Sequence, residues 1–392
     1  MIINNLISTI KESVRGLTLR DGIIYFIFPV FLAVCVFPDF YAIYAPGIDT
    51  SVFWIYNRLI NERISDCRDL IFTHGPLTFL LFPIPTGNNL IIAAFIWCVA
   101  IFLFSFNFIL LSRQGGSNGL MAPVLILIIL LHLLEIQLLV AGIIISFYLL
   151  YFKTRKSGWI IPALLLSSVA IYIKAHAGIV CALVTLSFVG IDYYFNRKVW
   201  RSILWIILFI QCTLLFWFFL YGNLQGFLKF FYGTYQFALK NSGGSSWYPV
   251  NNWFYIGASI FIFILIPLIN RDKEIRIIYA LLIASAFAAW KHGMSREDIV
   301  HARGFFVFLL LIVVSGWLLA QGRFSKAEVA DFYPVTCLGT WQTAQYAQGI
   351  PESLETRMVR VFDSISTKPS TPSRRGILPE TVTRYSPGIV MS

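Results

Sequence analysis

The sequence predicts an all-α membrane protein with about ten transmembrane helices and a long first extracytoplasmic loop containing short interfacial helices. Two observations lead to this fold class. Hydrophobic residues make up 58% of the 392 residues and charged residues only 12%, about half the charged share of ordinary soluble domains. The apolar runs also lack the alternation typical of a transmembrane β-barrel, so helices are the spanning structure that remains.

Ten apolar runs approach the roughly 20 residues that a membrane-spanning helix needs. They lie at about 22–37, 88–112, 120–133, 135–152, 158–173, 176–195, 202–221, 252–269, 276–290 and 304–321. The run at 120–133 is short and could be re-entrant. No signal-peptide cleavage site follows the first run, so we expect that run to remain as a helix.

The net charge is +11, and the excess of positive residues lies mainly in the loops on one side of the membrane. Basic clusters usually stay on the cytoplasmic side of a membrane. The apolar stretches flanked by the clusters 153–156 and 197–201 must therefore cross the membrane an even number of times. The short loops on the side of these clusters are all net positive. The first long loop, 39–87, is net negative. Ten spans with both termini in the cytoplasm satisfy this rule, and the charge indicates topology rather than a nucleic-acid partner.

The composition changes near residue 322. Residues 1–322 form the predicted membrane domain, whereas 323–392 are polar and rich in Ser, Thr, Pro and Gly in places. Too little apolar surface is available there for a core, so we expect a mostly disordered cytoplasmic tail.

The first polar break, 46–85, is where we expect the most structure outside the spans. A helix is predicted to begin at Asp49, and apolar residues including Tyr56 follow at helical spacing. Asn57, Arg58, Asn61 and Glu62 fall on the opposite face, so we expect a short helix that lies in the membrane surface.

Ionisable residues gather on the extracytoplasmic side in this topology. Lys174 interrupts an apolar stretch at an outer turn, where a lysine is usually paired or functional, although snorkelling at a helix end explains it equally well. The last outer loop is rich in cations and suits a phosphate; its ionisable residues include Lys291, His292, Arg296, Asp298, His301 and Arg303. A helix cap following Ser295 is an alternative role for Asp298. The aromatic loop 222–251 favours interfacial anchoring over substrate binding.

With these residues in place, the chain resembles bacterial polytopic membrane proteins of the GT-C glycosyltransferase type. Three pieces carry the resemblance: Gly47-Ile48-Asp49, then 68–77, and then 291–301. The second piece is similar to a D-x-I-F-T-x-G-P-L pattern and the third to a K-H-G-x-x-R-x-D-x-x-H loop of that group. The resemblance covers roughly residues 20–322.

The resemblance implies an integral protein of the bacterial inner (cytoplasmic) membrane whose partners are membrane lipid and a polyprenyl-phosphate-linked sugar. The sugar would pass to a glycan or lipid acceptor on the extracytoplasmic side, and the oligomeric state is left open. By position, Asp49 matches the catalytic carboxylate of the group, with Asp69 as the second candidate. The expected substrate-binding residues are His74, Lys174, Lys291, His292, Arg296, Asp298 and His301.

The chemistry agrees with these residue types. The leaving group is a phosphate, so positive charge is needed where it departs, and a carboxylate must accept the proton of the acceptor hydroxyl. Asp49 and Asp69 could also hold a divalent cation such as Mg²⁺ or Mn²⁺. Hard cations take more oxygen ligands than these two residues supply, so the sequence requires no cofactor.

Two other functions remain open beside the enzyme that we favour. A lipid-linked polysaccharide polymerase or ligase would depend chiefly on Arg and His of the late loop. A transporter or flippase of lipid-linked saccharides would show broken helices with charge at the membrane midplane, and only Lys174 fits that pattern. Asp49 also has a simpler role as a helix cap.

Overall fold

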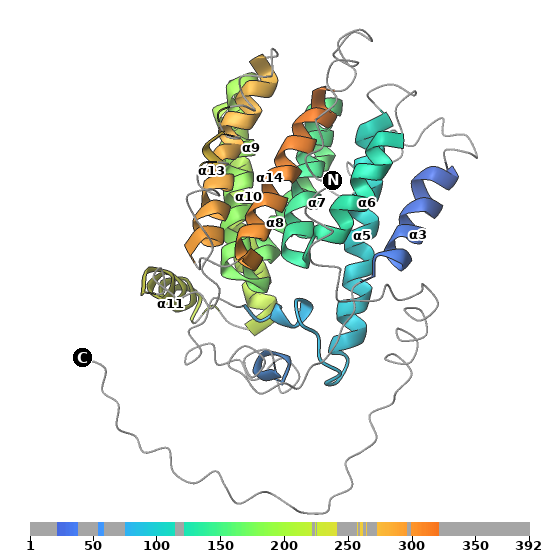
Figure 1. Cartoon of the computed structure of the whole chain (residues 1–392). Coiled ribbons are helices and arrows are strands. Elements are labelled where there is room, and N and C mark those ends of the chain that lie inside the picture. Colours follow the sequence, from blue (N-terminus) through green and yellow to red (C-terminus); the bar gives the residue numbers. More distant parts are fainter. Residues whose placement is uncertain are drawn as a thin grey trace, which may run out of the picture. The chain divides into compact units, whose positions relative to one another are not determined.

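The computed structural model describes residues 22–37, 54–58, 75–113, 121–221, 224, 226–240, 257, 259–261, 264, 273–295 and 299–320. The regular elements among them are all helices (Figure 1). They follow in chain order as η1 (Ile23–Ile27), α3 (Phe28–Cys35), η2 (Thr78–Leu80), α5 (Asn89–Arg113), α6 (Met121–Leu133), α7 (Ile136–Thr154), η4 (Ser157–Trp159), α8 (Ile160–Ile173), α9 (Ala175–Asn196), α10 (Val199–Tyr221), α11 (Phe227–Lys240), α13 (Lys273–Ser295) and α14 (Ile299–Ala320).

Five helical segments within the described residues are long and apolar enough to cross a membrane: Asn89–Ser112, Ile136–Thr154, Ala175–Asn196, Val199–Tyr221 and Ala302–Leu319. Shorter apolar helical segments lie at Ile23–Cys35, Ser157–Ile173 and Ile275–Trp290. The prediction of a helical integral membrane protein is confirmed at this level. Most of the predicted run 252–269, and the predicted tail 323–392, lie outside the described residues.

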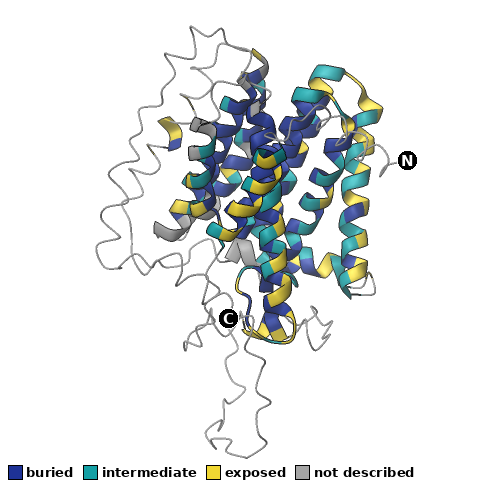
Figure 2. Cartoon of the chain, turned by 90° about the vertical axis from the view of Figure 1, so that its right-hand side faces the viewer, coloured by how far each residue is buried: buried dark blue, intermediate teal, exposed yellow. Residues whose placement is uncertain are grey.

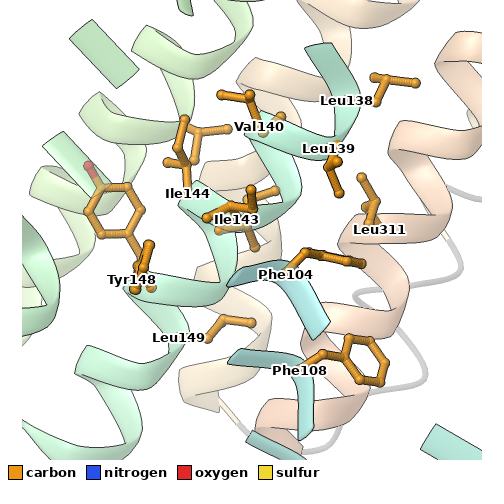
Figure 3. Close-up of a cluster of buried hydrophobic side chains, with 14 of the residues drawn as sticks. Phe104, Phe108, Leu138, Leu139, Val140, Ile143, Ile144, Tyr148, Leu149 and Leu311 are labelled. Carbon is orange, nitrogen blue, oxygen red and sulfur yellow. The ribbon is translucent and has the colours of Figure 1, made fainter. Parts of the chain in front are cut away.

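Helix α7 forms the centre of the bundle. Ile136 and every residue from 138 to 152 are buried, because α7 contacts α5, α8, α9 and α14. Figure 3 shows Phe104 of α5 and Leu311 of α14 beside the α7 side chains. A helix that is apolar all round is stable only when it is enclosed in this way or by lipid.

Helix α10 lies at the edge of the bundle and shows the opposite pattern. It contacts α8 and α9, and large apolar side chains cover its other face: Val199, Trp200, Ile203, Leu204, Ile207, Ile210, Leu215, Phe218 and Phe219. Buried residues concentrate between the helices and exposed ones on their outer faces (Figure 2). A continuous apolar surface of this kind indicates contact with membrane lipid.

The bundle has two polar ends, which lie at opposite ends of α9. At the first, here called the Lys174 end, the chain turns from α8 into α9 at Lys174. At the second, called the Asp192 end, Tyr151 of α7, Asp192 of α9 and Arg201 of α10 meet. The predicted candidate residue Lys174 belongs to the first.

Candidate functional site

The candidate site lies where α8 meets α9. Lys174 adopts extended backbone (φ −155°, ψ 130°) between the two helices, and its carbonyl oxygen accepts a hydrogen bond from the Gly178 N–H (2.9 Å). Lys174 is therefore the N-cap residue of α9. A cation is disfavoured at a helix N-terminus, because the helix dipole is positive there. The lysine charge and the helix dipole both favour an anion at this point.

Segment 75–81 of the first long loop is joined to the end of α8 by hydrogen bonds. The Leu77 N–H donates to the Tyr172 carbonyl (2.7 Å), and the Gly75 N–H donates to the Ile173 carbonyl (3.4 Å). The Thr78 hydroxyl lies 2.7 Å from the Ile173 carbonyl oxygen and 2.6 Å from the Gly75 carbonyl oxygen, so its single proton serves one of them at a time. The last carbonyls of a helix have no partner within it, and the loop supplies those partners here.

Two glycines allow other parts of the chain to approach the end of α8 closely. A Cβ atom on Gly75 would overlap the Tyr172 carbonyl, and a Cβ atom on Gly178 would overlap Ile171. The glycine of the D-x-I-F-T-x-G-P-L pattern, Gly75, thus has a steric reason: no Cβ atom fits at this position. Gly75 lies in the segment 68–77 that carries the resemblance, and the structure places it against the end of α8.

Asn57 corrects one prediction about the first loop. Helical spacing placed Asn57 on the polar face of a helix in the membrane surface, but its side chain is only 1% exposed. Its amide donates to the Phe82 carbonyl (2.9 Å), and its Oδ1 accepts hydrogen bonds from the Ile84 N–H (3.0 Å) and the Asn89 amide (3.1 Å). The prediction was wrong because spacing within one helix says nothing about a polar partner elsewhere in the chain. Asn57 joins the helical residues 54–58 to the start of α5.

An aromatic cluster adjoins the break at Lys174. Trp217 of α10 is 1% exposed, and its ring lies against Tyr172 of α8 and against Phe227 and Phe230 of α11, with centroid separations of 6.2, 5.4 and 5.6 Å. These contacts fix α11 to the end of α10. Large side chains of α11 remain exposed on another face: Leu228, Tyr232 and Tyr235. That exposed face is what the predicted interfacial anchoring requires.

Among the predicted site residues, Lys174 is the one whose side-chain burial the structure describes, and it is half-buried. The backbone places Lys291 and His292 near the end of α13 and His301 near the start of α14. These three residues therefore flank the connection between two helices that contact each other. The remaining predicted residues lie outside the described part of the chain: Asp49, Asp69, His74, Arg296 and Asp298.

The structure brings the end of segment 68–77 next to the chain at Lys174, about a hundred residues later in the sequence. Gly75, which follows His74, donates its hydrogen bond to Ile173, which precedes Lys174. The topology predicted from the sequence has both segments on the same side of the membrane, but it predicts no contact between them.

The Asp192 end contains a polar cluster that sequence analysis missed. Asp192 is 1% exposed and accepts hydrogen bonds from the Tyr151 hydroxyl (2.5 Å) and the Asn196 amide (2.6 Å). The Arg201 Nε lies 3.3 Å from its second oxygen, and the Arg201 Nη2 donates to the Tyr151 hydroxyl (2.7 Å). A lone Asp inside an apolar run is costly in a membrane, and that pattern could have revealed the cluster. Its charges are engaged with one another, so it joins α7, α9 and α10.

No group of three or more His, Cys, Asp or Glu side chains that could hold a metal ion is found within the described ranges. The predicted pair Asp49 and Asp69 lies outside those ranges. Comparisons of the chain with protein-family models, with curated proteins and with solved structures gave no match.

Proposed function

We propose that this protein is a membrane glycosyltransferase that transfers a sugar from a polyprenyl-phosphate donor to a glycan or lipid acceptor on the extracytoplasmic side of a bacterial inner membrane. The observation that carries the proposal is the hydrogen-bonded contact between the segment starting at Gly75 and the end of α8 beside Lys174. This contact joins the motif that carries the resemblance to the chain beside the lysine that interrupts an apolar stretch, which supports a common site for the two.

The chemistry of the proposed site starts from the leaving group. As the acceptor oxygen attacks the anomeric carbon, the bond from that carbon to the phosphate oxygen breaks and negative charge grows on the phosphate. A cation and a helix N-terminus at this position stabilise that charge. Lys174 at the start of α9 supplies both. In this proposal Lys291 and Arg296 complete the phosphate contacts from the turn between α13 and α14.

The proton of the acceptor hydroxyl needs a carboxylate. Asp69 precedes Gly75 by six residues, so a fully extended chain keeps it within about 22 Å of the α8 end. Asp49 precedes the described helical residues 54–58, which Asn57 fixes to the start of α5. Both carboxylates are therefore tied in sequence to segments fixed near the same part of the bundle, and we propose Asp49 as the base and Asp69 as its alternative.

The proposal includes ten spans with both termini in the cytoplasm, which places the Lys174 end outside. Single cysteines at positions 60, 243 and 295 should react with an impermeant thiol reagent added to intact cells. Cysteines at 155, 199 and 273 should react only after permeabilisation. Labelling of positions 155 and 243 from the same side would contradict the ten-span arrangement.

The test of function is the consumption of lipid-linked sugar by purified protein in detergent. Asp49→Asn keeps the size of the residue and its capping ability, so the protein should fold and still bind the donor, while turnover falls by at least ~10²-fold. If Asp49→Asn is active and Asp69→Asn is not, the base is Asp69. If both variants keep full turnover, the proposed mechanism is wrong.

A flippase of lipid-linked saccharides is less well supported. That function needs charge near the membrane midplane, whereas Lys174 lies at the tip between two consecutive helices that contact each other along the bundle. A polymerase or ligase is distinguished by the same variants, because it would depend on Arg296 and His301 rather than on Asp49.

A further inference from the structure

Glu135 places an exposed carboxylate at the start of α7. It is the N-cap residue of this helix (φ −76°, ψ 159°), but its side chain makes no hydrogen bond that caps the helix. Ser, Thr, Asp and Asn are the usual capping residues, so capping does not explain a glutamate at this place. Its Oε2 instead accepts a hydrogen bond from the Gln137 amide at 2.7 Å. Glu135 and Gln137 thus form one polar pair at the start of α7.

Glu135 lies at the same depth in the bundle as Lys174. α7 and α9 run in the same direction, and the Tyr148 hydroxyl of α7 donates to the Thr185 hydroxyl of α9 (3.0 Å). Glu135 precedes Tyr148 by 13 residues and Lys174 precedes Thr185 by 11. At about 1.5 Å per residue, the two positions differ in depth by about 3 Å. The hydrogen bond from Tyr151 at the Asp192 end gives a difference of the same size with the opposite sign, so the two residues are level.

The loop segment that contacts the end of α8 reaches the same depth. α5 also runs in the direction of α7, and the Asn107 amide of α5 donates to the Ser146 hydroxyl of α7 (2.9 Å). Trp97 precedes Asn107 by 10 residues, and Glu135 precedes Ser146 by 11. The Trp97 indole N–H donates to the Leu80 carbonyl of the loop segment (3.0 Å). Glu135, this segment and the break between α8 and α9 therefore lie at one level of the bundle.

Glu135 is also close to Lys174 across the bundle. α7 contacts both α8 and α9, the helices that meet at Lys174. The axes of packed helices are about 8–10 Å apart, and both side chains are long. A carboxylate and an ammonium group on adjacent helices at one depth can therefore contact the two ends of one small ligand.

The polar atoms at the start of α7 accept hydrogen bonds. An ionised carboxylate has no proton to donate, and the second polar atom of Gln137, Oε1, is buried without a hydrogen-bond partner among the described residues. A buried oxygen without a donor is costly. Hydroxyl groups supply such donors, whereas a phosphate is repelled by the carboxylate and attracted by Lys174. This pairing of charges favours a ligand that carries hydroxyl groups at one end and a phosphate at the other.

We propose that Glu135 and Gln137 bind hydroxyl groups of the transferred sugar while the phosphate of the donor lies at Lys174. The inference rests on the proposed function and adds to it the residues that recognise the sugar. It also fixes the direction of the donor, with the phosphate toward the start of α9 and the sugar toward the start of α7.

The experiment measures binding to the purified full chain in detergent with EDTA present. The ligands are undecaprenyl phosphate and a panel of undecaprenyl-phosphate-linked hexoses and pentoses. At least one linked sugar should bind about ten-fold more tightly than undecaprenyl phosphate, because it alone contacts the start of α7. Equal affinity of every linked sugar and of undecaprenyl phosphate would overturn the inference.

Glu135→Gln is the sharpest variant, since it keeps the size of the side chain and replaces a charged acceptor by a weaker neutral one. It should weaken binding of the linked sugar about ten-fold and leave undecaprenyl phosphate binding unchanged. Gln137→Leu should weaken the linked sugar several-fold and unfold at or above the temperature of the unmodified protein. Lys174→Gln should weaken both ligands alike. Gln236→Leu in α11, another half-buried glutamine, is the matched control and should bind both normally.

A carboxylate that only stabilises the helix dipole of α7 predicts a different result. Glu135→Gln would then lower the unfolding temperature and bind both ligands normally, which would overturn the inference and leave the proposed function intact. If the unmodified protein binds neither ligand, the proposed function is wrong and the inference fails with it. Stabilisation by Mg²⁺ or Mn²⁺ alone, measured without EDTA and lost in Glu135→Gln, would mean a cation site and would also overturn the inference.

Discussion

The two ends of α9 are held together by different kinds of interaction. At the Asp192 end, helices α7, α9 and α10 are joined by an ion pair and by hydrogen bonds to a buried carboxylate. At the Lys174 end, the hydrogen bonds between segment 75–81 and α8 are made by neutral groups, mostly of the main chain. A buried charge therefore stabilises the helix packing at one end, whereas close packing and main-chain hydrogen bonds stabilise the contact of segment 75–81 with α8 at the other. The proposed function assigns Lys174, the N-cap residue of α9 at the second end, to phosphate binding.

The largest effect on stability is expected at Asp192. Asp192→Ala removes the acceptor of two hydrogen bonds and the partner of Arg201, and should lower the free energy of unfolding by about 3 kcal/mol. This is the low end for a broken buried ion pair, because the Arg201 side chain is 29% exposed. Thermal unfolding in detergent measures the change. Asp192→Asn keeps one acceptor and should lose less, while turnover per folded molecule stays normal in both. If Asp192→Asn is stable but inactive, the Asp192 end has a role in function, and its assignment to structure alone is wrong.

The second effect is expected at Asn57, where the Lys174 end depends on a neutral side chain. Asn57→Ala leaves the Ile84 N–H and the Phe82 carbonyl without this partner, and should cost about 2 kcal/mol, since an unsatisfied buried group costs about 1–3 kcal/mol. Asn57→Asp keeps the acceptor oxygen but buries a carboxylate oxygen against the Phe82 carbonyl, so it should destabilise at least as much as alanine at neutral pH. An alanine variant with an unchanged unfolding temperature would show that segment 82–89 is held by other contacts.

The third effect is steric and concerns Gly75. Gly75→Ala would push the loop away from the Tyr172 carbonyl, and should cost about 1–3 kcal/mol, as overpacking does. It should also weaken donor turnover, because the loop carries the proposed Asp69. Gly190→Ala in α9 is the matched control: nothing lies within 4 Å of its added Cβ, so it should be neutral or slightly stabilising. If the two variants change the free energy of unfolding by the same amount, the steric role of Gly75 is wrong.

The sequence predicted those parts of the fold that depend on hydrophobicity and local spacing. The helix break at Lys174 and the turn between α6 and α7 follow from polar residues that interrupt apolar runs. The contact of Gly75 with the end of α8 could not be predicted, since it joins segments about a hundred residues apart through main-chain groups that every residue has. The burial of Asn57 was missed for the same reason. Asp192 was visible as a lone acid in an apolar run, but its partners Tyr151 and Arg201 come from two other helices.

The smallest effect on stability, and the most informative one, is expected at Lys174. If the lysine is there to bind a phosphate, Lys174→Gln removes a cation from the N-terminus of α9 and should leave the stability unchanged or raise it by about 0.3–1 kcal/mol. The affinity for a polyprenyl-phosphate ligand should nevertheless fall by roughly ten-fold or more, because a charge-assisted contact is worth about 1.5–3 kcal/mol. If the lysine merely snorkels to anchor the helix end, the same variant should lose stability and bind normally. Lys174→Arg keeps the charge and should retain most of the binding, although the guanidinium cannot reproduce the ammonium geometry in full. Binding measured in detergent, together with the unfolding temperature of the same samples, separates the two roles by the sign of each change.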